Sequence, residues 1–352
     1  MYPRLEIDAN KLKHNAEHLL KSCQENGIRD CMLVTKVLAG YRPLVRRLAT
    51  FGFSHLADSR IENLIRFQAV PIPKVLLRLP MPTEVSRVVR YADYSLQSEI
   101  LTIKATEKAA ARLGKTHGVI LMFDVGDLRE GLFFREDPGP LVQTVLDSPH
   151  LCLAGIGTNL TCYGGIVPDE ENLGRLIFIK QQIESRFSLR IPLISGGNSS
   201  SVHLFRTGRL PKEVNSLRIG EAFFLGRETA FGHLLPGMNP DAFILKAEII
   251  EVKVKPSYPI GNIGMNSFGA KPDIEDRGMM NRAILAIGRQ DVEPGDLIPL
   301  DAGVRIVGAS SDHLIVDLGN RTGKPGDVLA FGLNYPGLLR VMTSRYVKKR
   351  LK

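Results

Sequence analysis

The stretch Cys31-Met32-Leu33-Val34-Thr35-Lys36-Val37-Leu38-Ala39-Gly40 is an apolar run that ends in a lysine and then a glycine turn. Its length and composition predict a buried strand that meets a loop at Lys36. A buried ammonium is costly unless it is paired or chemically used, although a lysine at a strand end can also reach solvent along its stem. The chemical use of such an amine is covalent, as a Schiff base with a carbonyl.

Seven more short apolar runs follow this strand, separated by segments with helical periodicity. Eight strands alternating with helices are typical of a (β/α)8 TIM-like barrel, whereas an open doubly wound sheet usually has fewer strands. The predicted strands are Cys31–Val37, Phe53–Ala57, Lys74–Leu79, Ala92–Leu96, Gly118–Phe123, Leu151–Thr158, Ile191–Ser195 and Ser216–Ile219. The predicted helices are Asn10–Glu25, Pro43–Thr50, Arg60–Phe67, Glu84–Tyr91, Ser98–Leu113, Leu141–Leu146, Glu171–Phe187 and Ser200–Thr207.

After residue 235 the pattern changes to β-rich runs that are separated by Gly, Pro and Asp turns. We therefore expect a barrel over residues 1–235, followed by a C-terminal all-β domain over residues 236–352. The β-rich runs are Ile244–Val254, Asn281–Ile287, Arg305–Val307, Leu314–Leu318, Val328–Phe331 and Leu338–Met342.

The charge pattern favours a small-molecule partner over nucleic acid. The 352 residues carry 46 Lys and Arg against 37 Asp and Glu, and only the C-terminal segment from Arg345 to Lys352 is a basic cluster. Without a nucleic-acid motif, this tail predicts a solvated end. The four cysteines have no metal-ligand spacing, which predicts reduced thiols in a cytoplasmic protein and no metal site. No apolar stretch approaches the ~20 residues that span a bilayer, and no signal peptide precedes the first strand, so we expect no membrane partner.

The carboxyl ends of the strands carry the chemistry in a barrel of this kind. Ser195–Ser201 is rich in Gly and Ser and precedes a helix, and Gly220 follows the eighth strand. These segments predict a nest of backbone N–H groups that binds phosphate, although such a turn taken alone can simply cap a helix. A strand-end lysine, a phosphate nest and two strand-end arginines that could contact the polar atoms of a ring together indicate pyridoxal 5'-phosphate.

The chain resembles the alanine racemase family of pyridoxal-phosphate enzymes, and within it the ornithine racemase branch. Leu33–Gly40 is similar to the family's A-V-V-K-A-N-x-Y-G stretch, which implies that Lys36 forms the Schiff base. Asp124–Gly131 matches D-x-G-x-x-R-x-G, which implies that Arg129 contacts the phenolic oxygen of the cofactor and the substrate carboxylate. The segments that favour the ornithine branch are Gly126–Gly131, Thr161–Gly164, Leu225–Thr229 and Gly308–His313.

The resemblance assigns further cofactor contacts along the chain. Asn159 stands where many relatives have a ring-packing histidine, and Asn198-Ser199 resembles the phosphate-binding pair. Arg218-Ile219-Gly220-Glu221 resembles R-x-G-x, in which the arginine faces the pyridine nitrogen and the following backbone holds phosphate. Tyr346 resembles the tyrosine that binds the phosphate.

The resemblance also implies a racemase mechanism with one acid/base on each face of the substrate, and Lys36 serves one face. In typical relatives the second base is a tyrosine from the partner subunit's β domain, and Tyr258 lies two or three places before that position. A second β-domain motif aligns with Ser310-Ser311-Asp312 and is followed by His313. The candidates for the second base are therefore Tyr258, Asp312 and His313, with Ser311 and Asp312 at the substrate. The implied functional unit is a homodimer with shared active sites.

The prediction is a pyridoxal-phosphate-dependent amino-acid racemase, an isomerase, that acts on ornithine or another basic amino acid. The open alternatives are a broad-specificity alanine, lysine or serine racemase, a basic amino-acid decarboxylase of the same fold type, a non-catalytic pyridoxal-phosphate-binding protein, and a cofactor-free barrel enzyme in which Lys36 binds substrate phosphate. A basic substrate side chain needs an acidic wall. The candidates for that wall are Asp127, Glu130, Glu221 and Asp291.

Overall fold

The computed structural model describes residues 1–265 and 268–352, and the chain divides into two compact units. The first, here called the barrel, comprises Asn10–Pro240, and the second, the β unit, comprises Met1–Ala9 and Asp241–Lys352. The expected barrel range of 1–235 thus differs at its N-terminus. The reason is that strand β1 (Arg4–Ile7) pairs antiparallel with β11 (Phe243–Pro256), which places the first residues in the β unit.

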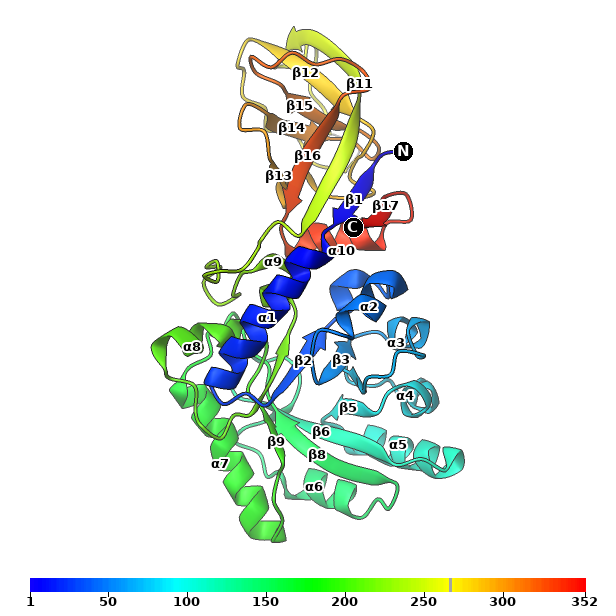
Figure 1. The fold of residues 1–352 in the computed structure, drawn as a ribbon, viewed down its shortest axis with the longest axis vertical. Helices are drawn as coiled ribbons and strands as arrows, with labels where there is room; N and C mark the ends of the chain where they lie inside the picture. Colours follow the sequence, from blue (N-terminus) through cyan, green and yellow to red (C-terminus); the bar gives the residue numbers. More distant parts are fainter. Residues whose placement is uncertain (266–267) are drawn as a thin grey trace. The chain divides into compact units, whose positions relative to one another are not determined.

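Among the described residues, eight parallel strands close the barrel into a ring (Figure 1). The last strand pairs with the first, with Arg218 opposite Met32, so the ring has no free edge. All eight predicted strands are present, with bounds that shift by a few residues. They are β2 (Asp30–Val34), β3 (His55–Asp58), β4 (Lys74–Leu76), β5 (Tyr94–Gln97), β6 (His117–Asp124), β8 (Leu151–Gly157), β9 (Leu193–Ser195) and β10 (Ser216–Ile219). A two-residue strand, β7 (Leu132–Phe133), pairs with the end of β6.

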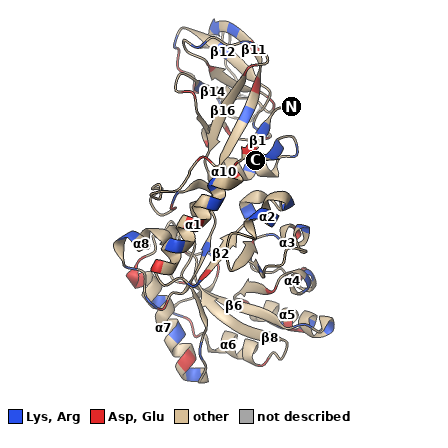
Figure 2. Ribbon diagram, in the orientation of Figure 1, with Lys and Arg blue, Asp and Glu red and all other residues tan. Residues whose placement is uncertain are grey.

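Helices α2 to α7 lie on the outside of this ring (Figure 1). Local sequence fixes their ends: Asp169 and Asn172 form a reciprocal capping box at the start of α7, and Gly114 ends α5 with φ of +60°. Lys and Arg positions recur along α2 and α7, whereas strand β8 carries no charged residue (Figure 2). The helices are α1 (Ala9–Glu25), α2 (Arg42–Leu48), α3 (Ile61–Arg66), α4 (Val85–Tyr91), α5 (Ile100–Leu113), α6 (Gly139–Leu146), α7 (Glu170–Phe187), α8 (His203–Thr207) and α9 (Glu221–Leu225).

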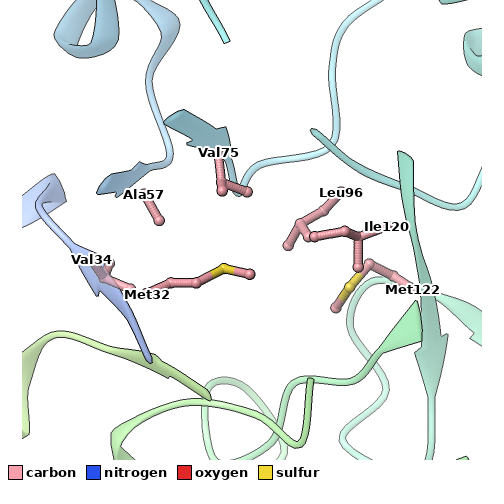
Figure 3. Packing of buried hydrophobic residues seen from close by; sticks show 7 residues of the cluster. All are labelled: Met32, Val34, Ala57, Val75, Leu96, Ile120 and Met122. Atoms are coloured by element: carbon pink, nitrogen blue, oxygen red, sulfur yellow. The ribbon is translucent and has the colours of Figure 1, made fainter. Parts of the chain in front are cut away.

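Alternate residues of successive strands fill the interior of the barrel, as the two-residue period of a strand requires. The side chains that meet there are Met32, Val34, Ala57, Val75, Leu96, Ile120 and Met122, each at most 7% exposed (Figure 3). Burial of such side chains contributes ~1.5–3 kcal/mol for each large one. Arg218 is the register partner of Met32 and therefore shares this inward face. Arg218 therefore lies among apolar side chains in the interior of the barrel.

The β unit is an antiparallel sheet in the order β13-β16-β11-β12-β15-β14, to which β1 and β17 attach. The first half of β11 alternates buried and half-buried residues, which is the pattern of a strand with one face on a core. The remaining strands are β12 (Met279–Leu285), β13 (Leu297–Pro299), β14 (Arg305–Ala309), β15 (Leu314–Asp317), β16 (Val328–Leu333) and β17 (Lys348–Leu351).

The strand expected at Leu338–Met342 is wrong, because this segment is part of helix α10 (Tyr335–Thr343). The Asn334 side chain accepts a hydrogen bond from the Gly337 N–H at 2.9 Å, and Pro336 occupies the first turn, where it costs no hydrogen bond. The buried residues Leu338, Val341 and Met342 then follow helical spacing. Asn334 and Pro336 are a helix start signal in the sequence, and a short apolar run such as Leu338–Met342 fits a strand or a helix equally well.

The expectation that the basic C-terminal tail is a solvated end is also wrong, because part of the tail is a paired strand. Residues Lys348–Leu351 form β17, which pairs in parallel with β1. The Lys352 ammonium donates to the Glu6 carboxylate at 2.7 Å, so acidic and basic residues of the two chain ends hold each other. In the part of the chain that the structure describes, we find no helix with the length and apolarity that crossing a bilayer requires.

Candidate active site

Lys36 begins a short 3-10 helix, η1 (Lys36–Leu38), directly after β2, and its side chain is half-buried. The preceding residue, Thr35, is fully buried, and its hydroxyl lies 3.0 Å from Asp58 Oδ2 and 3.2 Å from the Ala57 carbonyl oxygen. Ala39 ends the turn with φ of +48°, a left-handed conformation that is uncommon for a non-glycine residue. The turn that carries Lys36 is therefore tied to the neighbouring strand β3.

Asp58 is a completely buried carboxylate beside this turn. Its Oδ1 accepts hydrogen bonds from the Arg60 N–H and the Asn63 amide, both at 3.0 Å. Burial raises the pKa of Asp58 to about 6, although these hydrogen bonds, the Thr35 hydroxyl and the charge of Lys36 all oppose the rise. The positive charge of Lys36 thus favours the ionised form of Asp58, while burial favours the protonated form.

The predicted phosphate nest joins the loops after β9 and β10. Ser199 Oγ accepts hydrogen bonds from the Gly220 N–H at 3.2 Å and from the Ala222 N–H at 3.1 Å. The Asn198 side chain links this loop to the one after β8. Its Oδ1 accepts from the Ser200 N–H at 2.8 Å, and its Nδ2 donates to Asn159 Oδ1 at 2.8 Å. The backbone groups expected to bind phosphate therefore converge on one serine hydroxyl.

Two hydroxyls in this region have no hydrogen-bond partner among the described residues. They are Thr158 Oγ1, at the end of β8, and Ser200 Oγ, in the nest, and both residues are fully buried. A buried polar atom without a partner costs about 1–3 kcal/mol. Such atoms fit a site that a polar ligand completes.

Arg218 is buried, with 3% of its surface exposed, and its guanidinium reaches the neighbouring strand β9 and the end of β8. Nη1 donates to Ser195 Oγ at 2.5 Å, and Nη2 donates to the Thr158 carbonyl oxygen at 2.6 Å. Burial lowers the pKa of Arg218 to about 10, while the charge of Glu130 opposes this, so the group remains a cation at neutral pH. A Cβ on Gly157 would lie 3.3 Å from Nη1, so glycine at that position leaves room for the guanidinium.

Arg129 lies on the turn that follows β6, where Asp124 Oδ1 accepts the N–H groups of Gly126 and Leu128 at 2.8 and 3.2 Å. The Arg129 guanidinium pairs with the carboxylate of the next residue, with Nη2 2.6 Å from Glu130 Oε1. The same oxygen lies 3.5 Å from the Asn159 side-chain nitrogen. Arg129 is therefore neutralised by Glu130 in this structure.

Glu221 follows the nest and is half-buried. Burial raises its pKa to about 7, and the charges of Arg227 and Lys36 oppose this rise. Among the described residues its carboxylate has no hydrogen bond or ion pair, in contrast with Glu130.

The barrel brings most of the predicted site residues onto one rim, the carboxyl ends of its strands. These are Lys36, Arg129, Asn159, Asn198, Ser199, Arg218, Gly220 and Glu221. The other predicted residues belong to the β unit. There, Tyr258 and Tyr346 are exposed, Asp312 Oδ2 accepts from Ser311 Oγ at 2.7 Å, and His313 Nδ1 lies 3.4 Å from Ser310 Oγ.

A model of the alanine racemase N-terminal domain matches residues 7–228. The chain belongs to the alanine racemase family. It is 46% identical to an ornithine racemase of Acetoanaerobium sticklandii over the whole of both chains, and 38% identical to a lysine racemase of Thermotoga maritima over 99% of this chain and 98% of the relative. The solved alanine racemase of Streptomyces coelicolor A3(2) shares the fold, with a TM-score of 0.78 at 19% identity over 99% of this chain and 97% of the other. The predicted family, fold class and enzyme class, an amino-acid racemase, are confirmed.

Three of the four candidates for an acidic wall already have partners in this structure, and one of these is Glu130, which pairs with Arg129 as described above. Asp127 is buried and accepts hydrogen bonds from four backbone N–H groups of the loop 161–166. Asp291 lies in the β unit, where it accepts from Ser344 Oγ at 2.5 Å. Glu130 and Glu221 are therefore the two candidates on the rim whose carboxylates accept no backbone hydrogen bond among the described residues.

Sequence reasoning missed two contacts that organise the rim. One is the bond of Thr35 to Asp58 behind Lys36, and the other is the pairing of Arg129 with Glu130. The alternation of strands and helices does predict that residues at the ends of β2 and β3 are neighbours. It does not predict which side-chain atoms of those residues meet.

Proposed function

We propose that this chain is a pyridoxal-phosphate-dependent racemase that interconverts L- and D-ornithine. The observation that carries the proposal is the rim of the barrel, where Lys36, the Ser199 nest and the buried Arg218 belong to the neighbouring strands β2, β9 and β10 or to the loops that follow them. The 46% identity to an ornithine racemase supports the choice of substrate, and the 38% identity to a lysine racemase makes lysine the next to test.

The residues on the rim fit the cofactor. Lys36 would hold it covalently, the Ser199 and Ser200 hydroxyls with Gly220 would hold its phosphate, and Arg218 would face its ring nitrogen. The unpartnered hydroxyls of Ser200 and Thr158 support this fit, because a bound phosphate and ring would give them partners. When bound, the cofactor supplies a conjugated ring that makes the α-proton of an attached amino acid acidic.

The side chains of the barrel would then position the substrate and move the proton. Arg129 would bind the α-carboxylate through paired N–H donors, the geometry for which a guanidinium is suited. Lys36, once released from the cofactor, would exchange the α-proton on one face. Arg218 remains protonated at neutral pH and would donate a hydrogen bond to the ring nitrogen rather than a proton.

We propose that the second acid/base is Tyr258, Asp312 or His313. It would come from the β unit of the partner in a homodimer, and Ser311 would lie beside the substrate. Tyr346 would reach the phosphate. The exposure of Tyr258 and of the Asp312-His313 turn supports a role at a surface that a second subunit covers. The four free thiols support a cytoplasmic location.

Absorption spectroscopy and borohydride trapping test the cofactor site. The purified protein should be yellow, and borohydride should fix the cofactor on Lys36. Lys74 is the matched control, because it is a buried lysine of the same barrel whose amine donates to the Val70 and Ile72 carbonyls. A Lys36→Ala variant should lose the trapped adduct, and a Lys74→Met variant should keep it. A colourless protein that cannot be reconstituted would contradict the cofactor assignment.

Polarimetry and chiral chromatography with L-ornithine test the reaction. Optical rotation should vanish without loss of mass, and the Lys36→Ala variant should lose this activity by at least about 10³-fold. Release of carbon dioxide would instead indicate a decarboxylase. Colour without turnover of any amino acid would indicate a cofactor-binding protein with no catalytic role.

A further inference from the structure

The carboxylates on the barrel rim fall into two groups according to what they bind. Asp58, Asp124 and Asp127 accept backbone N–H groups that shape the loops around them. Moving any of these carboxylates would take hydrogen-bond acceptors away from the backbone N–H groups that define these loops. These three carboxylates stabilise the loops of the rim and are poorly suited to bind a substrate instead.

Glu130 is different, because among the described residues it is bound by side chains and not by backbone N–H groups. It pairs with the Arg129 guanidinium at 2.6 Å, and its Oε1 also lies 3.5 Å from the Asn159 amide nitrogen. Its side chain is 19% exposed, while that of Arg129 is 41% exposed. Both side chains therefore reach solvent at the rim, and the negative member of the pair is the more enclosed of the two.

We infer that Glu130 selects substrates with a cationic side chain by exchanging Arg129 for the side-chain ammonium. The inference rests on the proposed function, in which the α-carboxylate of the substrate binds Arg129. In this proposal that α-carboxylate binds the Nε and Nη2 edge of Arg129, which Glu130 occupies in this structure, so its binding displaces Glu130. A diamino acid brings its own ammonium to the released glutamate, so two ion pairs replace the original one.

The exchange discriminates against small neutral substrates. Alanine also displaces Glu130 from Arg129, but it supplies no cation, so a mostly buried carboxylate loses its partner. Leaving one member of an enclosed ion pair unpaired is strongly unfavourable, and specificity arises from this penalty as much as from attraction to the correct substrate. Glu130 is thus a specificity-determining residue for ornithine and lysine over alanine.

The test measures kcat/KM for L-ornithine and L-alanine in the holoenzyme and in its Glu130→Gln variant. We expect ornithine turnover to fall about 10²-fold, while alanine turnover stays level or rises, so the ratio of the two collapses. Glu130→Asp keeps the charge and should retain more of the ornithine preference than Glu130→Gln does. Equal losses for both substrates would overturn the inference and reduce Glu130 to a positioning residue for Arg129.

Glu221→Gln is the matched control, since Glu221 is the other half-buried rim carboxylate that shapes no loop. It should change both substrates alike and leave their ratio intact. A ratio that collapses in Glu221→Gln and persists in Glu130→Gln would overturn the inference. If the wild-type enzyme racemises neither ornithine nor lysine, the proposed function itself fails. If the wild type prefers ornithine and Glu130→Gln keeps that preference, only the present inference fails.

Discussion

The barrel rim and the β unit treat buried charge in opposite ways. In the β unit, burial alone would raise the pKa of Glu6, but hydrogen bonds from Lys352 and Lys246 outweigh it and lower the pKa to about 2. Arg4 adds a contact at 2.7 Å. On the rim, burial prevails, and it raises the pKa of Asp58 to about 6 and that of Glu221 to about 7.

The difference shows where charge stabilises the fold and where it is kept at a cost. Glu6 joins β1 to β11 and to the C-terminal residue, so its ion pairs hold the two ends of the chain together. Asp58, Glu221 and Arg218 are desolvated without full compensation, as is common at functional sites. Substitutions that remove a charge should therefore separate the two regions: in the β unit they should lower stability, whereas on the rim they should leave stability at neutral pH level or raise it and act mainly on activity.

The largest effect is expected for Arg218→Leu. Catalytic turnover should fall by at least about 10³-fold, because the group proposed to face the cofactor's ring nitrogen is lost. The free energy of unfolding should change by no more than about 1 kcal/mol, since replacing a buried charge with an apolar side chain removes a desolvation penalty. Urea unfolding and chiral assays measure the two quantities. The matched variant in the β unit is Arg4→Leu, which should lower stability. A large stability loss in Arg218→Leu would erase the contrast between the regions.

The next effect is the loss of the Glu6 ion pairs in Glu6→Gln. The folded-state pKa of Glu6 lies below its ordinary value of 4.5, so its stabilisation is complete above that pH and is lost as pH falls through about 2. At pH 7 the variant should be less stable by about 2–3 kcal/mol. Urea unfolding at several pH values should show the gap closing as pH falls from 5 toward 2. A gap that is constant with pH would mean that packing, and not charge, holds Glu6.

Asp58→Asn should give a smaller effect of the opposite sign. The folded-state pKa of Asp58 lies above its ordinary value of 3.8, so its contribution is favourable below that pH and is lost as pH rises through about 6. The wild type should thus lose about 1–2 kcal/mol relative to Asp58→Asn between pH 4 and pH 7. The Thr35 hydroxyl can donate to the Ala57 carbonyl instead, so the turn that carries Lys36 is expected to persist. Parallel stability curves for the two proteins would show that Asp58 titrates normally.

The sequence predicted the barrel more fully than it predicted the site. Strand and helix positions follow from apolar periodicity, and Lys36 and Arg218 could be placed because each ends or lies within a periodic run. The partners of these residues depend on side-chain geometry across neighbouring strands, which periodicity does not encode, and the Thr35 to Asp58 bond is one example. In the β unit, Leu338–Met342 was misassigned because five apolar-rich residues fit either period, and only the Asn334 cap distinguishes a helix.

The smallest effect sharpens the comparison inside the β unit. Arg305 and Asp317 face each other across β14 and β15 with Nη2 to Oδ2 at 3.0 Å, but the Arg305 side chain is 43% exposed. Solvent screens such a pair, so Arg305→Ala should cost no more than about 0.5 kcal/mol, and 0.5 M salt should weaken even that. Glu6→Gln, measured in parallel, should retain most of its cost in salt because Glu6 is buried. A cost for Arg305→Ala as large as that for Glu6→Gln would show that the number of ion pairs, rather than their burial, sets the stability of this unit.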